Sequence, residues 1–540
     1  MPRRPPTSSD RPAPSAWSPL RLPLFRALWI ATVASNVGTW LQGVGAAWLM
    51  TTLAPSATLV ALVQAATSLP MFLLSLPAGA LADVFDRRRL LLAAQAWMLV
   101  GAALLALFTF AGWIGPWSLL GFTFVLGLGA AINQPAWQAI VPELVPREEL
   151  GRAVALGSVA FNLARAAGPA LGGLLVATAG AEANFVLNAT SFAGVIVVLY
   201  RWRRPQEQSV LPAERVLGAM RTGLRYVRHS PAVRSVIARG AAFVLCASSL
   251  WALLPVVSRE DLGTGPAGYG LLLASLGAGA VAAAVALPHV RRGESAEPVV
   301  AVAAVLFAAA TLGLAWLPSF PLVVAGLFFA GGAWMALLSS LNVAIQTQVP
   351  GWVRARALSV YMLFFFGALA GGSALWGALA ERYGTAWSLS AAAAGILAGL
   401  AVTAHLPLPT GEGLDLAPSR QWPAPLVRAN LEPDRGPVIV LVHFHIDPAR
   451  ADAFRRAMAD RRRIRLRDGA LQWGLFADSA EEGRYTEVFL VKSWLEHLRQ
   501  HERLTHADTE VDRAAHTFHL GPEPPRVEHL IAESVPRAPG

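Results

Sequence analysis

A single arginine, Arg165, lies near the middle of the long apolar stretch 152–178. If that stretch crosses a bilayer, a charge at this depth costs from about 2.5 kcal/mol on insertion scales to over about 10 kcal/mol in simulations, so the guanidinium must face protein or a water-filled cavity. Arg165 could therefore offer a fixed positive charge to an anionic small molecule. Alternatively, neighbouring amides hold it in a buried polar network; the candidates are Asn162, Asn133, Gln134 and Gln138.

Amide side chains recur in the other apolar stretches. We expect them to line the same cavity as Arg165, although some must serve only helix packing. The set is Asn36, Gln42, Gln64, Asn133, Gln138, Asn162, Asn342 and Gln346.

Carboxylates do not occur in the middle of any apolar stretch. Asp83 and Glu143 lie near the ends on one side, and Glu182 lies near an end on the other. Carriers that couple to protons usually place a carboxylate where burial can raise its pKa. Coupling to protons would therefore use Asp83 or Glu143 at the margin, or else the driving mechanism is different.

The composition is that of an integral membrane protein. Of 540 residues, 55% are hydrophobic and only 14% are charged, with a mean hydropathy of +0.48. A soluble enzyme of this length would not tolerate so apolar a surface. The net charge of +10 comes from arginines clustered in loops, which membrane topology explains better than nucleic-acid binding. With Cys246 as the single cysteine, the chain can form neither an intramolecular disulfide nor a Cys-based metal site.

About twelve apolar stretches reach the roughly 20 residues that a membrane-spanning helix needs. Six precede Arg201 and six follow Arg234, and the arginine-rich segment between them is the longest gap. The predicted spans are roughly 25–52, 57–81, 89–111, 116–140, 152–178, 183–200, 236–257, 267–290, 297–317, 320–346, 355–379 and 385–405.

The arginines predict the orientation of these spans. If the N-terminus is cytoplasmic, almost all loop arginines fall on the inner side, and the outer side keeps little more than Arg259 and Arg382. The positive-inside rule therefore places both termini in the cytoplasm.

The two sets of spans resemble each other. A shift of 204 positions lays VPREELGRAVAL, starting at Val145, on VPGWVRARALSV, starting at Val349. The same shift superposes Gly168 on Gly372 and Gly173 on Gly377. A shared shift over two distant span junctions indicates an internal repeat.

The chain changes character after His405. Residues 406–437 are rich in Pro and Gly and are typical of a linker, whereas 438–520 alternates apolar and charged residues as soluble domains do. The pattern predicts strands at 437–446, 470–477, 484–491 and 515–520, and helices at 448–463 and 493–507. This βαββαβ order is ferredoxin-like.

Histidines in this C-terminal part invite a metal interpretation. His443 and His445 share one strand face, and His497 and His501 share one helix face. Neither pair has a cysteine or a clear carboxylate partner in its motif, so we predict no metal site. A role in dimerisation or regulation is the simpler expectation for the domain, although haem-degrading monooxygenases of the same type make an enzyme imaginable.

Two motifs carry a resemblance to a known family. GALADVFDRRRLL, from Gly79 to Leu91, and GPALGG, from Gly168 to Gly173, resemble the major facilitator superfamily over 25–405, although Asp86 stands where that pattern usually has glycine. The segment from Asn133 to Gly173 is similar to bacterial exporters grouped with the enterobactin exporter and with transmembrane secretion effectors. That similarity extends through the C-terminal domain and implies an inner-membrane exporter working by alternating access.

The resemblance assigns a gating role to the first motif. Gly79, Asp83, Arg87 and Arg88 match the family pattern, and an ion pair of Asp83 with the arginines in one access state would act as a latch. The alternative is an anchoring cluster that only satisfies membrane topology.

The second motif is a candidate contact about which the two halves rock. Its small residues let two helices approach to backbone contact. A simple packing face is the alternative. With their repeat partners, the residues are Gly168, Pro169, Gly172, Gly173, Gly372 and Gly377.

The predicted fold class is an all-α membrane bundle of twelve transmembrane helices in two six-helix halves, plus a C-terminal α+β ferredoxin-like soluble domain. We place a disordered N-terminal tail at 1–24, the halves at 25–200 and 236–405, and a cytoplasmic central loop at 201–235. The linker is 406–437 and the soluble domain 438–525.

These features predict a multi-pass exporter in a bacterial inner membrane. Its substrate would be a small siderophore-like, drug-like, amphipathic or anionic molecule, and its partners would be the lipid bilayer and a coupling ion such as a proton. We expect no enzymatic activity, cofactor or nucleic acid, and we consider dimerisation through the C-terminal domain. The alternative is a membrane-tethered sensor or regulatory protein whose activity lies in that domain.

Overall fold

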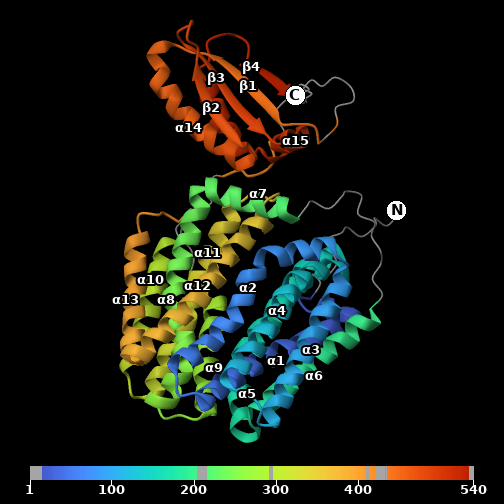
Figure 1. The fold of residues 1–540 in the computed structure, drawn as a ribbon, viewed down its shortest axis with the longest axis vertical. Helices are drawn as coiled ribbons and strands as arrows, with labels where there is room; N and C mark the ends of the chain where they lie inside the picture. The colour runs from blue at the N-terminus through green and yellow to red at the C-terminus, as the bar shows by residue number, and fades with distance from the viewer. Residues whose placement is uncertain are drawn as a thin grey trace, which may run out of the picture.

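The computed structural model describes residues 15–202, 216–290, 296–408, 414–419, 432 and 434–533. They form a long bundle of helices with an α+β region stacked on one end of it (Figure 1). We call the end beside the α+β region the near end and the opposite end the far end.

Long helices make up the bundle, and their bounds lie within a few residues of the predicted spans. The first half contains α1 (Pro23–Leu53), α2 (Ala57–Val84), α3 (Arg87–Phe110), α4 (Pro116–Leu144), α5 (Leu150–Ala179) and α6 (Ala181–Arg201). The second half contains α8 (Pro231–Val256), α9 (Pro266–Val290), α10 (Glu297–Trp316), α11 (Phe320–Gln348), α12 (Arg354–Tyr383) and α13 (Thr385–Thr403).

Eleven helices in the described part of the chain are long and apolar enough to cross a membrane. The helix outside this group is α1, which has 31 residues but carries Asn36 and Gln42 and is less apolar. It nevertheless packs between α5 and α6. The twelve predicted spans are therefore found as helices, of which eleven meet the criteria for a span.

The internal repeat is visible in the backbone. Gly180 joins α5 to α6 with a φ of 83°, and Gly384 joins α12 to α13 with a φ of 90°. These two glycines are related by the same shift of 204 positions as Gly168 and Gly372. Residues that carry a side chain rarely adopt such a φ. Glycine at both positions therefore lets the chain reverse its direction within one residue.

The predicted central loop contains a helix that the hydropathy pattern did not predict. This helix, α7 (Val216–His229), lies across the near end of the bundle (Figure 1). Gly223 lies against Arg356 at the start of α12, and Tyr226 and Val227 are buried. The segment is short and amphipathic, so it carries no long apolar run.

The C-terminal region is an antiparallel sheet covered on one face by helices. The strands are β1 (Val438–His445), β2 (Gln472–Ala477), β3 (Arg484–Val491) and β4 (Arg526–Ile531), in the order β2-β3-β1-β4. The helices are α14 (Ala451–Asp468), α15 (Trp494–Arg503) and α16 (His506–His516). The register places Val440 of β1 between Phe489 of β3 and His529 of β4.

Two details of the predicted domain are wrong. The stretch 515–520 is not the last strand, because its first residues end α16 and the edge strand is β4 at Arg526–Ile531. The helix predicted at 493–507 breaks at Leu504, where Thr505 caps α16 by accepting a hydrogen bond from the backbone of Asp508. A capping threonine starts a new helix, and periodicity alone cannot locate it.

Candidate functional site

Arg165 lies where the two halves of the bundle come into backbone contact. Its side chain is only 9% exposed on α5, and its carbonyl oxygen faces α9, where a Cβ placed on Gly277 would lie 2.4 Å away. The guanidinium Nε is buried, and no described residue accepts a hydrogen bond from it. Leaving such a donor unpaired costs of the order of 1 to 3 kcal/mol, which a ligand could recover.

The amides near Arg165 direct their hydrogen bonds elsewhere. Asn162 donates to the carbonyl of Ser158, one turn back on its own helix, at 2.9 Å. Asn133 accepts from Gln95 of α3 at 3.0 Å. In the described residues, neither amide therefore bonds to Arg165. The buried network that would make Arg165 purely structural is not formed through them.

Gln42 belongs to a polar contact between α1 and α6. Its Oε1 accepts a hydrogen bond of 3.0 Å from Asn188, and both side chains are buried. Asn184, one turn before Asn188, donates to the carbonyls of Leu41 and Gly172 at 2.8 and 3.2 Å. Sequence reasoning missed both asparagines, although their spacing of four residues within an apolar span was a readable signal.

The other predicted amides do not converge on Arg165 through any described contact. Gln64 donates to Ser68 at 3.2 Å within α2, and Gln346 donates to Asn342 within α11. Asn36 is half-buried and Gln138 is exposed. The structure therefore places these side chains on α1, α2, α4 and α11, in both halves.

Contacts between the halves close the far end of the bundle. Trp48 of α1 stacks on Tyr269 of α9 with ring centroids 6.1 Å apart. Glu381 of α12 accepts hydrogen bonds from the Ser56 hydroxyl at 2.9 Å and from the Thr58 backbone at 3.2 Å. Arg259, just after α8, donates to the carbonyl of Thr51.

The near ends of α4 and α5 are not joined to α11 and α12 in the same way. Gln138, Ser158 and Gln346 are exposed there, and Gly157 has no neighbour within 4 Å of a Cβ placed on it. The described contacts between the halves thus include α5 against α9 up to the level of Arg165, and α2 against α12.

The small-residue motif makes two kinds of contact. Gly168 and Gly172 lie against Trp40 and Val44 of α1, within the first half. Gly173 lies against α9, where a Cβ would come within 2.4 Å of the Pro266 carbonyl and 2.8 Å of the Gly270 Cα. The Pro169 carbonyl also faces Gly270.

The repeat partners of these glycines occupy equivalent places. Gly372 lies against Leu245 and Ser248 of α8, within the second half. Gly377 lies against Ala61 of α2, where a Cβ would approach within 2.4 Å. One glycine of each motif therefore packs inside its own half, and another brings the halves together.

The predicted gating loop is held by contacts within the first half. Arg87 donates to Glu143 at 2.9 Å and to the Ala139 carbonyl at 3.0 Å, both on α4. Arg88 donates to the carbonyls of Leu199 and Tyr200 at the end of α6, at 2.9 and 2.7 Å. Gly79 and Asp83 belong to the last turns of α2, but the surroundings of Gly79 and the side chain of Asp83 are outside what the structure describes.

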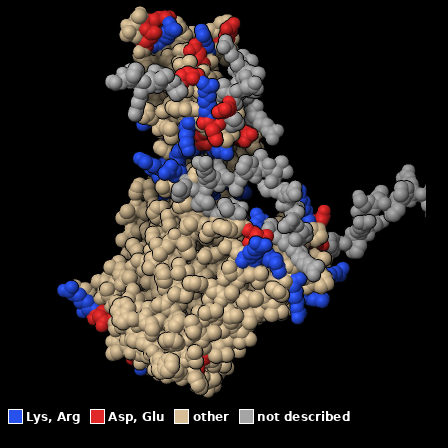
Figure 2. Space-filling model, turned by 45° about the vertical axis from the view of Figure 1, so that its right-hand side comes forward, with Lys and Arg blue, Asp and Glu red and all other residues tan. Residues whose placement is uncertain are grey.

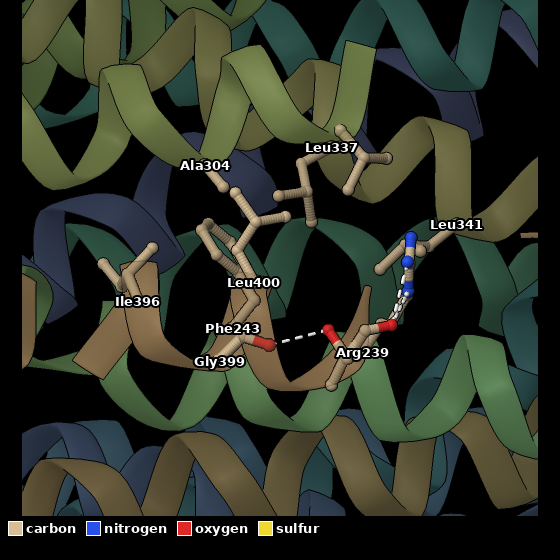
Figure 3. Close-up of a pocket in the computed structure, with 10 residues that line it drawn as sticks. Arg239, Phe243, Ala304, Leu337, Leu341, Ile396, Gly399 and Leu400 are labelled. Atoms are coloured by element: carbon tan, nitrogen blue, oxygen red, sulfur yellow. Dashed lines mark hydrogen bonds between the residues drawn. The ribbon is translucent and has the colours of Figure 1, made fainter. Parts of the chain in front are cut away.

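A second buried arginine occupies a small pocket among α8, α10, α11 and α13 (Figure 3). Arg239 donates to the Thr403 carbonyl at 3.0 and 2.9 Å and to Glu297 at 2.7 Å. The rest of the lining is apolar and includes Phe243, Leu337 and Ile396. Unlike Arg165, this arginine has its partners in place, and its pocket lies inside one half, so we assign it to packing.

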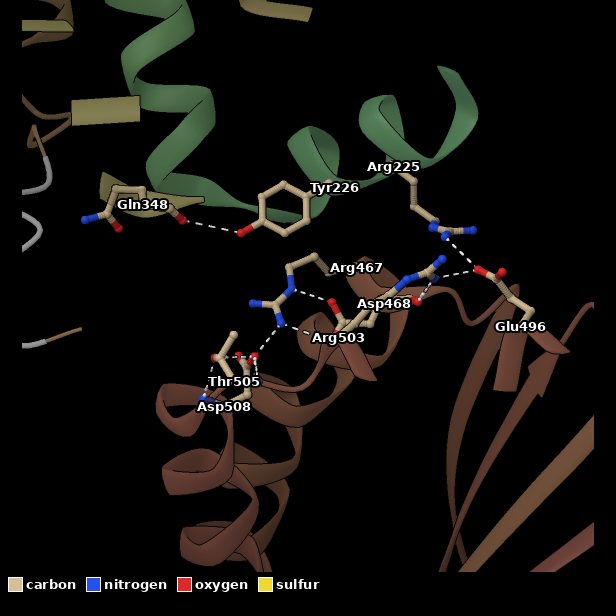
Figure 4. Close-up of polar contacts among 9 residues, drawn as sticks. All are labelled: Arg225, Tyr226, Gln348, Arg467, Asp468, Glu496, Arg503, Thr505 and Asp508. Atoms are coloured by element: carbon tan, nitrogen blue, oxygen red, sulfur yellow. Dashed lines mark hydrogen bonds and ion pairs between the residues drawn. The ribbon is translucent and has the colours of Figure 1, made fainter. Parts of the chain in front are cut away.

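The C-terminal region docks on α7 and on the loop between α11 and α12 (Figure 4). Arg225 of α7 pairs with Glu496 at 3.4 Å, and Arg503 stacks over the Trp352 ring with 4.7 Å to its centroid. Arg467 lies 5.5 Å from the centre of the Tyr226 ring. Every docking contact named here is made with the second half and its α7, so the region is attached to one side of the bundle.

The model of the family described as "Transmembrane secretion effector" matches residues 14–537. The chain belongs to this family of the major facilitator superfamily. It is therefore a multi-pass membrane transporter of small molecules, in a family that includes siderophore exporters and drug efflux pumps and that consists of transporters, not enzymes.

Relatives with named activities are distant in sequence. The chain is 29% identical over 397 residues to Enterobactin exporter EntS of Shigella boydii, covering 69% of this chain and 89% of that protein. It is 27% identical over 378 residues to Multidrug efflux pump Tap of Mycolicibacterium fortuitum, covering 68% and 90%. It is 23% identical over 332 residues to Staphyloferrin A transporter of Staphylococcus aureus, covering 61% and 82%.

Solved structures share the fold of the bundle. A bacterial homolog of the human lysosomal transporter Spinster, in an inward-facing and occupied conformation, matches with a TM-score of 0.58 and 15% identity over 72% of this chain and 97% of that one. A POT family transporter in complex with 5-aminolevulinic acid also matches with a TM-score of 0.58, at 13% identity over 71% and 96%. The predicted fold of the bundle is thus confirmed at the level of the superfamily.

Proposed function

We propose that the protein exports a small anionic or amphipathic organic molecule, siderophore-like or drug-like, by alternating access. The observation that carries this proposal is Arg165, an enclosed cation between the halves whose Nε lacks a partner in the described structure. An anionic group of a substrate would supply the missing acceptor. The three relatives named above, two of them tied to siderophores and one to drugs, support the substrate class.

The contacts between the halves support alternating access. They close the far end through Trp48, Tyr269 and Glu381, while Gln138, Ser158 and Gln346 toward the near end are exposed. A substrate would then enter from the near end, reach Arg165, and leave after the halves rock about the glycine contacts at Gly173 and Gly377. The predicted amides on both halves would line this route.

We propose that α1 is the twelfth span. Its length exceeds that of several counted spans, and the Oε1 of its buried Gln42 accepts a hydrogen bond from Asn188, which lowers the cost of placing this amide in the membrane. The strand order β2-β3-β1-β4 likewise supports a ferredoxin-like fold for the C-terminal domain, with the domain boundaries given above. The exposed face of that sheet, with Ile439 and Leu530, is the surface that would serve dimerisation.

The near end would face the cytoplasm of a bacterial cell, in its inner membrane. The docking of the C-terminal region at this end agrees with the arginine distribution, which places both termini inside. Reporter fusions at Gly540 should be active only in a cytoplasmic format. Activity confined to the periplasmic format would reverse the direction of transport.

The gating loop would stabilise one access state. Asp83→Asn removes a charge and keeps the volume at the membrane margin, so transport should fall strongly while membrane insertion stays intact. Glu143, the described partner of Arg87, would hold the loop's arginine in place. Normal efflux by a fully expressed Asp83→Asn variant would exclude the latch and leave an anchoring cluster.

The competing function is a membrane-tethered sensor whose activity lies in the C-terminal domain. A mere anchor would need neither the repeated bundle nor an enclosed arginine between its halves. Comparing the metabolites that cells with and without the protein retain distinguishes the two. If the protein is an exporter, cells that lack it retain a specific anionic compound. If it is a sensor, its loss changes no retained compound directly.

A further inference from the structure

A basic surface lies at the junction between the C-terminal domain and the bundle. We call the junction patch the four exposed arginines Arg221 and Arg228 of α7, Arg234 of α8 and Arg462 of α14. Within the described ranges, no carboxylate forms an ion pair with any of them. Figure 2 shows Lys and Arg side chains gathered at this level, whereas the visible flank of the bundle is almost free of charge.

Three of these arginines surround one histidine. His229, at the end of α7, is partly buried, and its pKa is lowered by that burial and by the positive charges of Arg228, Arg225, Arg462 and Arg234. Positive charges from α7, α8 and α14 therefore act together on His229. Among the described residues, only Arg225 of this group has a carboxylate partner, Glu496.

The patch lies at the depth of lipid headgroups. The α7 helix ends at His229, and the membrane-spanning helix α8 begins at Pro231, so Arg228 and Arg234 flank the point where the chain enters the bilayer. On the exposed face of α7, Leu224 is 53% exposed and lies one turn from both Arg221 and Arg228. An exposed leucine between arginines is the pattern of helices that lie in a membrane interface.

We propose that the junction patch binds the headgroups of anionic phospholipids and that these lipids bridge the bundle to the C-terminal domain. Arginines on α7 and α8 contact the phosphates from the bundle side, and Arg462 contacts them from the domain side. Leu224 inserts among the acyl chains. In the described part of the chain, the guanidinium of Arg462 is otherwise held only by the face of Trp473, 5.9 Å from its ring centre, so it can reach a phosphate.

The geometry favours a membrane over a nucleic acid. Arg228 and Arg234 flank the start of the membrane-spanning helix α8, where a basic side chain meets lipid headgroups before it meets a nucleic acid. Anionic lipids are also the partner that basic groups next to a span most often meet. The lipid would add to the direct contact of Arg225 with Glu496, so the domain would be held to the bundle in two ways.

The test uses the full-length protein purified in neutral detergent. Thermal unfolding is measured after adding phosphatidylglycerol, phosphatidylcholine or inorganic phosphate, and bound lipid is counted by native mass spectrometry. The variant combines Arg228→Gln, Arg234→Gln and Arg462→Gln. The control combines Arg382→Gln, Arg455→Gln and Arg463→Gln, which removes the same charge from exposed arginines outside the patch.

We expect phosphatidylglycerol, but not phosphatidylcholine, to stabilise the wild type and to remain bound. The patch variant should lose most of this shift and of the bound lipid, whereas the control should match the wild type. Should the patch variant fail to fold, Arg462→Gln alone, on the surface of α14, should lose part of the effect.

Three results would overturn the proposal. Equal stabilisation by inorganic phosphate would show that a free anion, not a lipid, occupies the patch. Unchanged lipid retention by the patch variant would place the lipid elsewhere. A single-stranded oligonucleotide that displaces phosphatidylglycerol from the wild type but not from the patch variant would show a nucleic-acid surface.

Discussion

At the scale of single residues, two buried arginines of the bundle differ in one respect. Arg239 is neutralised by Glu297 and bonded to the Thr403 carbonyl, whereas the Nε of Arg165 has no described acceptor. A charge enclosed in a membrane protein needs compensation at some stage of its cycle. For Arg239 that compensation is permanent, and for Arg165 it would arrive with the substrate.

Glycine at 173 permits the far end to close. A Cβ there would lie 2.4 Å from the Pro266 carbonyl, so Gly173→Ala should strain only the conformation in which the far end is closed. Overpacking of this kind costs about 1 to 3 kcal/mol, and transport should fall by about 5-fold to about 150-fold, since 1.4 kcal/mol corresponds to a factor of ten.

Gly157 of the same helix provides the matched control. No atom lies within 4 Å of a Cβ placed on it, so Gly157→Ala should transport at nearly the wild-type rate. Efflux assays at equal amounts of folded protein would compare the two. Equal rates for Gly173→Ala and Gly157→Ala would show that the contact at Gly173 plays no part in rocking.

At the scale of elements, α15 of the C-terminal domain carries a cluster of neutral histidines. Burial, followed by the nearby His501 and His529, lowers the pKa of His497 to about 3. Burial, followed by His529 and Arg465, lowers the pKa of His501 to about 4. The two Nε2 atoms lie 3.2 Å apart, which allows one hydrogen bond between neutral rings.

These shifts predict that the domain loses stability in mild acid. The unfolded histidines have a pKa near 6.5 and bind protons that the folded ones exclude, so stability is intact above about pH 6.5 and falls as the pH drops toward about 4. The loss is of the order of 1 kcal/mol per pH unit and histidine. Hydrogen exchange of α15 in the full chain, corrected for the intrinsic pH effect, would measure it.

A variant isolates the cause of this pH dependence. His497→Gln keeps a neutral polar side chain and should flatten the profile, whereas His445→Gln, at an exposed position, should not. Identical protection of α15 at pH 7.5 and pH 5 in the wild type would contradict the account.

At the scale of the whole molecule, the C-terminal domain and the bundle have separate hydrophobic cores. The domain core gathers Val440, Phe444, Phe454 and Phe489, and it shares no residue with the cores of the helices. Deleting 430–540 should therefore leave a bundle that inserts and folds. Size-exclusion profiles would check folding, and the deletion should expose Tyr226 and Trp352 to quenchers.

Transport by the truncated protein then decides the role of the domain. A regulatory domain docked on α7 and the α11–α12 loop predicts an altered rate or loss of control. Transport at the full rate under all conditions would make the domain dispensable, and failure to insert would show that the two cores are not independent.

Hydropathy and the repeat predicted the long helices because lipid requires a spanning helix to be long and apolar. A single polar residue does not remove that signal from the sequence. Hydropathy and the repeat could not predict α7, because this helix is short and amphipathic. They could not predict β4 either, because α16 and a turn separate this strand from the preceding elements. Arg165 stood out by its charge alone. The Asn184–Asn188 contact and the stacking of Trp48 on Tyr269 depend on which helix faces which, and the sequence does not contain that information in a local form.

The central claim is that Arg165 binds the anionic group of the exported molecule. The most direct measurement is efflux, from proteoliposomes, of the compound that accumulates in cells lacking the protein. Arg165→Lys keeps the charge but loses the planar fork that pairs with two oxygens, so it should retain partial transport. Arg165→Gln should lose transport of the anion, and the far-end control Arg382→Gln should keep it.

Amounts of folded protein must be matched by size exclusion before rates are compared. The account predicts that folded Arg165→Gln inserts normally and fails only with anions. Wild-type efflux of the anion by Arg165→Gln, or its failure to accumulate as folded protein while Arg165→Lys does, would contradict the account and make Arg165 a structural residue.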